Sequence, residues 1–271
     1  MHTGAFDDLA NDYDAIFTDT AIGRVLRDLV WARMNTRFGD CRCVLELGCG
    51  TGEDAVQLAR GGVRVVATDA SAEMIRIAQH KALLAGCLDR IAFHCVEMEQ
   101  LGHVLEGMQF DGVLSNFGAV NCARDFPNLV ADVASRLRPG GTLLWVVMGR
   151  YVPWEWAWFL LHGRWRAALR RLTPGGVRWR GVTVSYPRPQ EMLRWLRPYF
   201  RVDRISPLGF ALPPSYAGAW LARSPHVLTR LAEVERRGQR WSALAHIADH
   251  YVVEGTRLSV GSGARAGPSA S

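Results

Sequence analysis

The chain has 271 residues, of which 49% are hydrophobic, and this size and composition fit one large folded unit with a full core. The formal charge of +6 comes almost entirely from scattered arginines, with Lys81 the single lysine, which argues against a nucleic-acid partner. The 6 cysteines have no CxxC spacing, so the sequence predicts no disulfide framework and no metal site, and a reducing cytoplasm is the expected location.

Short apolar runs with little alternation predict buried strands of a parallel sheet, at residues 42–47, 63–69, 91–96, 110–115 and 142–148. Helical patterns separate them, at residues 53–60, 72–85 and 127–137. The second of these begins after Ser71, a good N-cap, and ends at Gly86, a good helix stop. Because strands and helices alternate, residues 41–148 are predicted to form a doubly wound α/β core.

The alternation stops after residue 148. Residues 149–187 are rich in tryptophan and arginine and are predicted to be an inserted cap with a short extra strand at 181–186. The longest apolar stretch, residues 151–163, is interrupted by Glu155 and is too short to span a bilayer, so no membrane segment is expected. The sheet is expected to resume over residues 188–258, with a helix at 188–198, strands at 200–206 and 250–258, and a helical insertion from about Tyr216 to Ala248. Residues 259–271 are predicted to be disordered.

Three glycines, Gly48, Gly50 and Gly52, follow the first predicted strand. Glycine tolerates positive φ and lets a ligand approach the backbone, while the free N–H groups of the next helix favour negative charge. The spacing is G-x-G-x-G, not the G-x-G-x-x-G of dinucleotide sites, which favours a nucleotide that carries an amino acid and no pyrophosphate. The carboxylate of Glu46 would receive its ammonium group. An ordinary tight turn is the alternative interpretation of the glycines.

The ends of the next two predicted strands supply candidate contacts for the rest of such a ligand. Asp69 lies 19 positions after Gly50, where a doubly wound fold brings a carboxylate to ribose hydroxyls; the alternative is a helix-capping aspartate. After the third strand, Met98 is expected against an adenine ring, and Glu97 is expected to accept from its exocyclic amine.

The sequence resembles the class I S-adenosylmethionine (SAM)-dependent methyltransferases in "ELGCGTG" (46–52), "ATDAS" (67–71), "FDGVLSNFGAVN" (110–121) and "LRPGGTLLWVV" (137–147). The resemblance implies SAM as the cofactor and a seven-stranded Rossmann-like sheet whose last strand is antiparallel. It also implies an N-terminal helical lid, residues 1–40, with Phe6, Tyr13 and Phe17 on its inner face, unless these rings pack on the core. Glu97 departs from the aspartate common at its position. The implied cofactor-binding residues are Tyr13, Glu46, Gly48, Cys49, Gly50, Gly52, Asp69, Ala70, Met74, Glu97, Met98, Ser115, Asn116 and Phe117.

The sequence excludes some methyl acceptors more readily than it identifies one. Residues 115–121 are not Asn-Pro-Pro-aromatic, which argues against methylation of an exocyclic base nitrogen. We expect transfer, at oxygen, to a small and largely apolar metabolite of specialised metabolism, met by the cap. The cap tryptophans could instead only pack the cap on the domain, and its arginines are interpreted as a solvated face rather than an anion site; these are Trp154, Trp156, Trp158, Trp165, Arg164, Arg166, Arg170 and Arg171.

Other activities stay open. They are C- or N-methylation of a small molecule, methylation of RNA or protein, or SAM binding without methyl transfer, as in a cyclase or sensor. A monomer or a homodimer is expected.

His250 is the leading candidate for a catalytic base. If residues 250–258 form the antiparallel last strand, His250 lies at the carboxyl edge of the parallel strands, beside Met148, and could take a proton from a hydroxyl. Asp249 need not orient it, because neighbouring strand residues point to opposite faces. The competing interpretation is that His250 bonds a backbone carbonyl and closes the strand. Glu155 and Tyr251 are the alternative bases, and Tyr13 is a catalytic candidate expected near the sulfonium.

Overall fold

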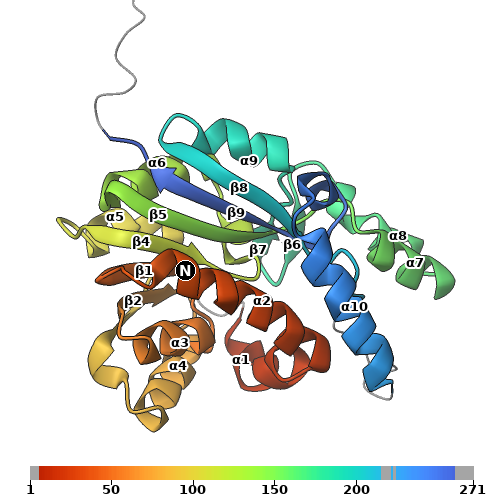
Figure 1. Ribbon diagram of the computed structural model, residues 1–271, viewed down its shortest axis with the longest axis horizontal. Helices are drawn as coiled ribbons and strands as arrows, with labels where there is room; N and C mark the ends of the chain where they lie inside the picture. Colours follow the sequence, from red (N-terminus) through yellow and green to blue (C-terminus); the bar gives the residue numbers. More distant parts are fainter. Residues whose placement is uncertain (1–5, 215–220, 222–223, 260–271) are drawn as a thin grey trace, which may run out of the picture.

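The computed structural model describes residues 6–214, 221 and 224–259, and a twisted sheet flanked by helices lies at its centre (Figure 1). The sheet has the strand order β3-β2-β1-β4-β5-β9-β8. The strands are β1 (Cys43–Leu47), β2 (Arg64–Asp69), β3 (Ile91–Cys95), β4 (Phe110–Ser115), β5 (Leu137–Met148), β8 (Phe200–Leu208) and β9 (His250–Arg257). Each predicted core strand is present, and β5 begins at Leu137 rather than at residue 142.

The last strand, β9, runs antiparallel to its two neighbours, β5 and β8, whereas the strands from β3 to β5 pair in parallel. The predicted Rossmann-like sheet with an antiparallel last strand is therefore confirmed. The chain moves outward from β1 to β2 and β3 and then returns to β4 on the other side of β1. Ligands of α/β sheets bind where the carboxyl ends of two such strands diverge, here those of β1 and β4.

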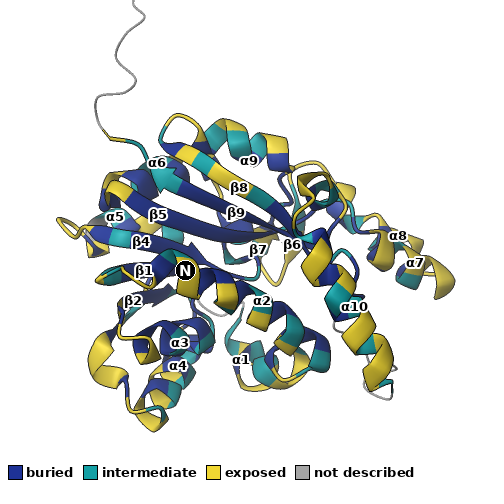
Figure 2. Cartoon of the chain, viewed as in Figure 1, coloured by how far each residue is buried: buried dark blue, intermediate teal, exposed yellow. Residues whose placement is uncertain are grey.

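Helices cover both faces of the sheet; its central strands are buried, whereas the edge strands β3 and β8 are partly exposed (Figure 2). One core contains Val44 and the helices α2 (Ala21–Phe38), α3 (Glu53–Arg60) and α4 (Ala72–Leu84). The other contains Leu45, Leu47 and the helices α5 (Leu101–Val104), α6 (Phe126–Arg136) and α9 (Pro189–Leu196). Successive residues of β1 enter opposite cores, which is why the strand reads as a continuous apolar run.

Two groups of elements surround the carboxyl edge of the sheet. The first group is α1 (Asp7–Tyr13), a π-helical turn (Asp14–Thr18) and α2. The second is the cap, with α7 (Pro153–Leu161), α8 (Trp165–Ala168), a 3-10 turn (Arg170–Leu172) and the hairpin of β6 (Val177–Trp179) and β7 (Val182–Val184). The hairpin turns on Arg180 and Gly181, both with positive φ, as tight two-residue hairpins require. The sequence analysis predicted only the second strand of this hairpin.

The predicted helical insertion contains α10 (Pro225–Gly238) and a 3-10 stretch (Ser242–His246). Its predicted start near Tyr216 lies outside the described residues, as do residues 260–271 of the predicted disordered tail. Other 3-10 turns lie at Leu88–Arg90, Met98–Gln100 and Ala119–Cys122. Within the described ranges, no helix is long and apolar enough to cross a membrane.

Candidate active site

The loop between β1 and α3 contains the three predicted glycines, with φ of 67°, 52° and 83° for Gly48, Gly50 and Gly52. A Cβ on Gly48 would lie 2.3 Å from Cβ of Ala119, and one on Gly52 would lie 2.7 Å from Cβ of Ala78, so these two glycines permit close packing. A Cβ on Gly50 would meet nothing within 4 Å. The middle glycine therefore faces open space, and a ligand could touch the backbone there.

Asp69, at the end of β2, holds this loop in place. Its carboxylate accepts hydrogen bonds from the backbone N–H groups of Gly50 and Ser71, both at 2.9 Å. Burial raises the pKa of Asp69, and these hydrogen bonds oppose the rise. Ser71, rather than Asp69, caps α4, because its hydroxyl accepts from the N–H of Met74. Each oxygen of Asp69 keeps a lone pair for a further donor, such as a ribose hydroxyl.

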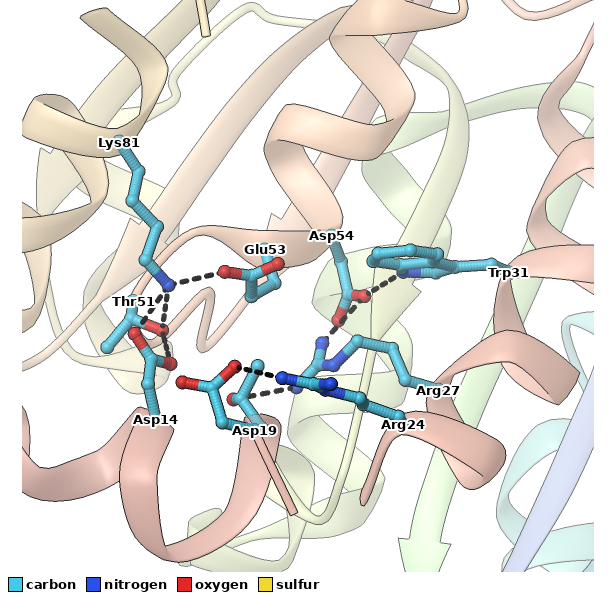
Figure 3. Close-up of polar contacts among 10 residues, drawn as sticks. Asp14, Asp19, Arg24, Arg27, Trp31, Thr51, Glu53, Asp54 and Lys81 are labelled. Atoms are coloured by element: carbon cyan, nitrogen blue, oxygen red, sulfur yellow. Dashed lines mark hydrogen bonds and ion pairs between the residues drawn. The ribbon is translucent and has the colours of Figure 1, made fainter. Parts of the chain in front are cut away.

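A buried ion pair joins α2 to α3 beside the loop (Figure 3). Asp54, in the first turn of α3, accepts hydrogen bonds from Arg27 at 2.9 Å, Trp31 at 2.6 Å and Asn116 at 2.7 Å. The guanidinium carbon of Arg27 lies 4.9 Å from the ring centre of Phe117. Arginine keeps its charge when it is buried, so the guanidinium of Arg27, paired with Asp54, is a charged group that lines the same cavity as Gly50.

The N-terminal segment packs against the loop from the other side (Figure 3). Asp14 accepts a hydrogen bond from Thr51 at 2.8 Å and pairs with Lys81 at 2.6 Å. Lys81 also pairs with Glu53 at 2.5 Å. Burial works to raise the pKa of Asp14, but hydrogen bonds from Lys81 and Thr51 bring it below its usual value. The single lysine of the chain therefore ties this segment to α3 and α4.

The aromatic residues of the predicted lid take different positions. Tyr13 lines the cavity at the glycine loop, and Phe17 packs edge-on against Phe117 at 4.7 Å between ring centres. Phe6 instead contacts Trp179 of the cap hairpin at 5.2 Å between ring centres. Burial raises the pKa of Tyr13 to about 12. The protonated phenol is therefore its form at neutral pH, and the roles of Tyr13 as a cofactor contact and as a catalytic candidate stay predictions.

The cavity at the loop has a volume of about 30 Å³, enough for about one water. Its polar groups nevertheless fit an amino-acid moiety. Arg27 is suited to a carboxylate. Glu46, on β1, does not line this cavity, but its Oε2 is buried and has no hydrogen-bond partner within the described part of the chain, so its carboxylate is suited to an ammonium group. Burial raises the pKa of Glu46 well above its usual value, and a cationic ligand would compensate for that cost.

His250 lies at the predicted edge of the sheet, in register with Met148 of β5. Its ring packs edge-on against Phe117, with 5.8 Å between the ring centres. Phe117 has a φ of 43°, a strained value for a residue with a side chain. This conformation sets one aromatic ring between Arg27 and His250.

A chain of charged groups runs from His250 into the cap. The carboxylate of Asp249 lies 3.2 Å from Nδ1 of His250, as a charge contact that is not aligned as a hydrogen bond. Asp249 also pairs with Arg171 at 2.7 Å, and Arg171 pairs with Glu155 at 2.6 Å. Burial works to raise the pKa of Asp249, but His250 and Arg171 hold it well below its usual range. Although neighbouring residues on a strand point to opposite faces, the carboxylate of Asp249 therefore lies beside the ring of His250.

A larger cavity, of about 580 Å³, lies at the β8 edge of the sheet, between α9, β8 and the 3-10 stretch at Ser242–His246. None of the predicted site residues lines it. The glycine loop remains the candidate site, because the strained Phe117, the exposed backbone of Gly50 and the buried charges converge there.

Residues 44–141 match the methyltransferase domain family. The core of this chain is a class I SAM-dependent methyltransferase domain. The chain is 28% identical over 151 residues to the tRNA 5-carboxymethoxyuridine methyltransferase of Escherichia coli K12, covering 53% of this chain and 56% of that protein. It is 27% identical over 169 residues to the ubiquinone biosynthesis O-methyltransferase of Sodalis glossinidius, covering 62% of this chain and 63% of that protein. The chain thus spans less than two thirds of these curated relatives.

The fold of the methyltransferase domain is shared with the solved structure of the DhpI complex with S-adenosylhomocysteine. The TM-score is 0.54 at 19% identity, over 95% of each chain. The predictions of the family, of its sheet and of SAM as the cofactor of this domain are confirmed.

Most of the predicted cofactor contacts of the methyltransferase domain gather at the loop. Tyr13, Gly48, Cys49, Gly50, Asn116 and Phe117 line the cavity, as do Arg27 and Asp54, which the sequence analysis missed. Met98 approaches Gly48, Ala70 follows Asp69 at the end of β2, and Glu97 pairs with Arg124 at 3.1 Å. The roles of these residues toward SAM stay predictions. The sequence feature that could have indicated Arg27 is its position as a charged residue among the apolar residues of α2.

Four other predicted site residues are buried. Ser115 is fully buried and donates its hydroxyl to the carbonyl of Leu47 within the sheet. Met74 is buried in α4, and its contact with SAM stays a prediction. Glu155 is 1% exposed, and its two oxygens contact Arg170 and Arg171, so it is not free to act as a base. Tyr251 is fully buried, donates to the carbonyl of Pro187, and has a pKa that burial raises well above its usual value.

Asp69→Asn should weaken SAM binding to the methyltransferase domain by about 30-fold, near ~2 kcal/mol, because a neutral amide makes weaker hydrogen bonds than a carboxylate. Isothermal titration calorimetry measures the affinity. Asp89→Asn is the matched control, because Asp89 lies in the turn before β3, at the opposite edge of the sheet. Equal affinities of the two variants would assign the ribose contact to another residue.

Proposed function

We propose that this chain transfers the methyl group of SAM to the oxygen of a small, largely apolar acceptor, with His250 as the base. The observation that carries the proposal is the contact of His250 with Phe117, a ring that also contacts Phe17 and Arg27 beside the glycine loop. Only the ring of Phe117 lies between His250 and the glycine loop. A base at this position would be close to an acceptor hydroxyl that approaches the methyl group.

When bound, SAM supplies a methyl group that its positive sulfur has already activated. Gly50 would leave room for its methionine part, Arg27 and Glu46 would hold the carboxylate and the ammonium, and Asp69 would orient the ribose. As the acceptor oxygen forms its bond to the methyl carbon, the bond from that carbon to sulfur breaks. His250 takes the proton that the hydroxyl loses, and Asp249 stabilises the resulting imidazolium.

The cap favours a small acceptor over RNA. Of its arginines, Arg171 is buried between Glu155 and Asp249, and Arg170 pairs with Glu155. Arg164 and Arg166 lie against Phe159 and Trp165. The contacts with Glu155 take Arg170 and Arg171 out of the exposed basic surface, and RNA binding requires such a surface to be continuous. Because one relative modifies tRNA, the test below includes RNA as an acceptor.

The test is methyl transfer from labelled SAM to a panel of phenols, enols and fatty hydroxy acids, with amines, thiols and total tRNA as comparison acceptors. Oxygen methylation of an apolar acceptor, detected by mass spectrometry, is the expected result. Labelling of tRNA alone, or SAM binding without transfer to any acceptor, would contradict the proposal.

Asp249→Asn should lower kcat by about 10-fold and leave the affinity for SAM near that of the wild type. The carboxylate lies 3.2 Å from Nδ1 of His250, so its loss removes the charge that stabilises the imidazolium formed when His250 takes the proton. The measurement is kcat at saturating SAM, with SAM affinity by calorimetry. Asp203→Asn, in β8, is the control, and its kcat should match that of the wild type. An unchanged kcat in Asp249→Asn would separate this carboxylate from the reaction.

A further inference from the structure

The cap helix α7 has one charged side chain, Glu155, and it is buried. Glu155 and Phe159 point into the protein, while Trp154, Leu160 and Leu161 on the other side are exposed, Leu161 by 85%. A surface helix normally carries polar residues on its outer side, so an outer side without any polar side chain indicates a second contact.

The exposed apolar surface continues beyond α7. Trp165 of α8 is 57% exposed, and Leu169 and Leu172 are exposed as well. Hydrogen bonds from Gly163 to the carbonyl of Leu160 and from Arg164 to that of Phe159 join α7 to α8. Figure 2 shows the two helices extending from one end of the molecule, away from the sheet. We call this surface the cap patch; it consists of Trp154, Leu160, Leu161, Trp165, Leu169 and Leu172.

The charges around the cap patch have one sign. Residues 149–187 contain 7 arginines, and their single acidic residue, Glu155, is buried. Arg164 and Arg166 are exposed on either side of Trp165, and the guanidinium of Arg166 lies 5.2 Å from the centre of that ring. Protein surfaces that enter the boundary between lipid headgroups and acyl chains have this composition: exposed tryptophan and leucine beside arginine, without carboxylates.

A second copy of the chain is a poorer occupant of the cap patch. In a twofold-symmetric dimer the same patch of each protomer would meet, which would bring Arg164 and Arg166 toward their own copies. The cap has no exposed carboxylate to separate these charges. An anionic bilayer offers both a medium for the apolar side chains and negative headgroups for the arginines.

We propose that the cap patch docks the protein onto the surface of an anionic lipid bilayer. The docking is peripheral and requires no spanning helix. It also explains why the cap is rich in tryptophan, a residue that favours membrane interfaces. Docking does not rest on the proposed methyl transfer, but the ion pairs from Glu155 through Arg171 to Asp249 connect the docked helix to His250. An apolar acceptor dissolved in the bilayer would enter the site from this side.

The test is flotation of the full chain with vesicles of phosphatidylcholine, with and without phosphatidylglycerol. We expect flotation only with the anionic vesicles, and its loss at high salt. The double variant Arg164→Gln/Arg166→Gln should bind about 30-fold more weakly, at ~1 kcal/mol for each arginine. Leu161→Glu should remove most of the bound fraction, because it places a carboxylate in the cap patch.

Leu84→Glu, a variant at a leucine of α4 that is 75% exposed and lies outside the cap, is the matched control and should float like the wild type. Circular dichroism and thermal unfolding establish that each variant is folded. The proposal is overturned if the wild type floats with neither vesicle, or if Leu161→Glu and Leu84→Glu float equally. It is also overturned if Leu161→Glu changes only the oligomeric state in gel filtration, since the cap patch would then be an interface between copies.

Discussion

Gly50→Val should weaken SAM binding by at least about 1000-fold while the protein stays folded. The Cβ of residue 50 points into open space at the glycine loop, so the added methyl groups would occupy the volume that the methionine part of the cofactor needs. The substitution also places a β-branched residue at a φ of 52°, which costs about 1–2 kcal/mol. That strain is smaller than the stability of a typical domain, about 5–15 kcal/mol, so the fold should survive.

A matched control separates strain from occlusion. Gly86 has a φ of 66°, and a Cβ there would also meet nothing within 4 Å, but it follows α4 at the opposite edge of the sheet. Gly86→Val should therefore lose the same stability and keep SAM affinity. Calorimetric titration and thermal unfolding of both variants give the two quantities. Binding by Gly50→Val within about threefold of the wild type would place the methionine moiety away from this loop.

The sheet was predictable because each strand carries its own signal. A strand that helices cover on both faces needs apolar residues at successive positions, and Val44, Leu45 and Leu47 show this without knowledge of the rest of the chain. The glycine loop was predictable for a similar local reason. A side chain at position 48 or 52 would clash where the chain turns, so these positions require glycine, and the glycines can be seen in the sequence.

The charged part of the site could not be predicted in this way. Whether Glu155 is a free base or a buried partner depends on Arg171 and, through it, on Asp249, and only the folded chain brings these residues together. Arg27 could not be predicted for the same reason, because its position beside Gly50 depends on its ion pair with Asp54 of another helix. The strand β6 was missed because its three residues, Val-Arg-Trp, become a strand by pairing with β7 and have no apolar run of their own.

His250→Ala should lower kcat by about 100-fold and leave the affinity for SAM within about threefold of the wild type. The ring of His250 does not line the cavity at the glycine loop, so its removal spares the cofactor contacts. What is lost is the group that accepts the hydroxyl proton, and a general base is typically worth about 10²–10⁴ in rate. The loss should shrink as pH rises, because an acceptor that is already ionised needs no base.

The competing role of His250, closing the end of β9, predicts a different pattern. A structural histidine would affect stability and SAM affinity, whereas a base affects the rate of the chemical step. His250→Gln retains a polar side chain that can hydrogen-bond, so it should restore stability to that of the wild type but restore none of the rate. His226→Ala, at an exposed position of α10, controls for the loss of a histidine as such. Single-turnover methyl transfer at saturating SAM measures the step, and wild-type rates in His250→Gln across neutral pH would remove His250 from the mechanism and leave the strand-closing role.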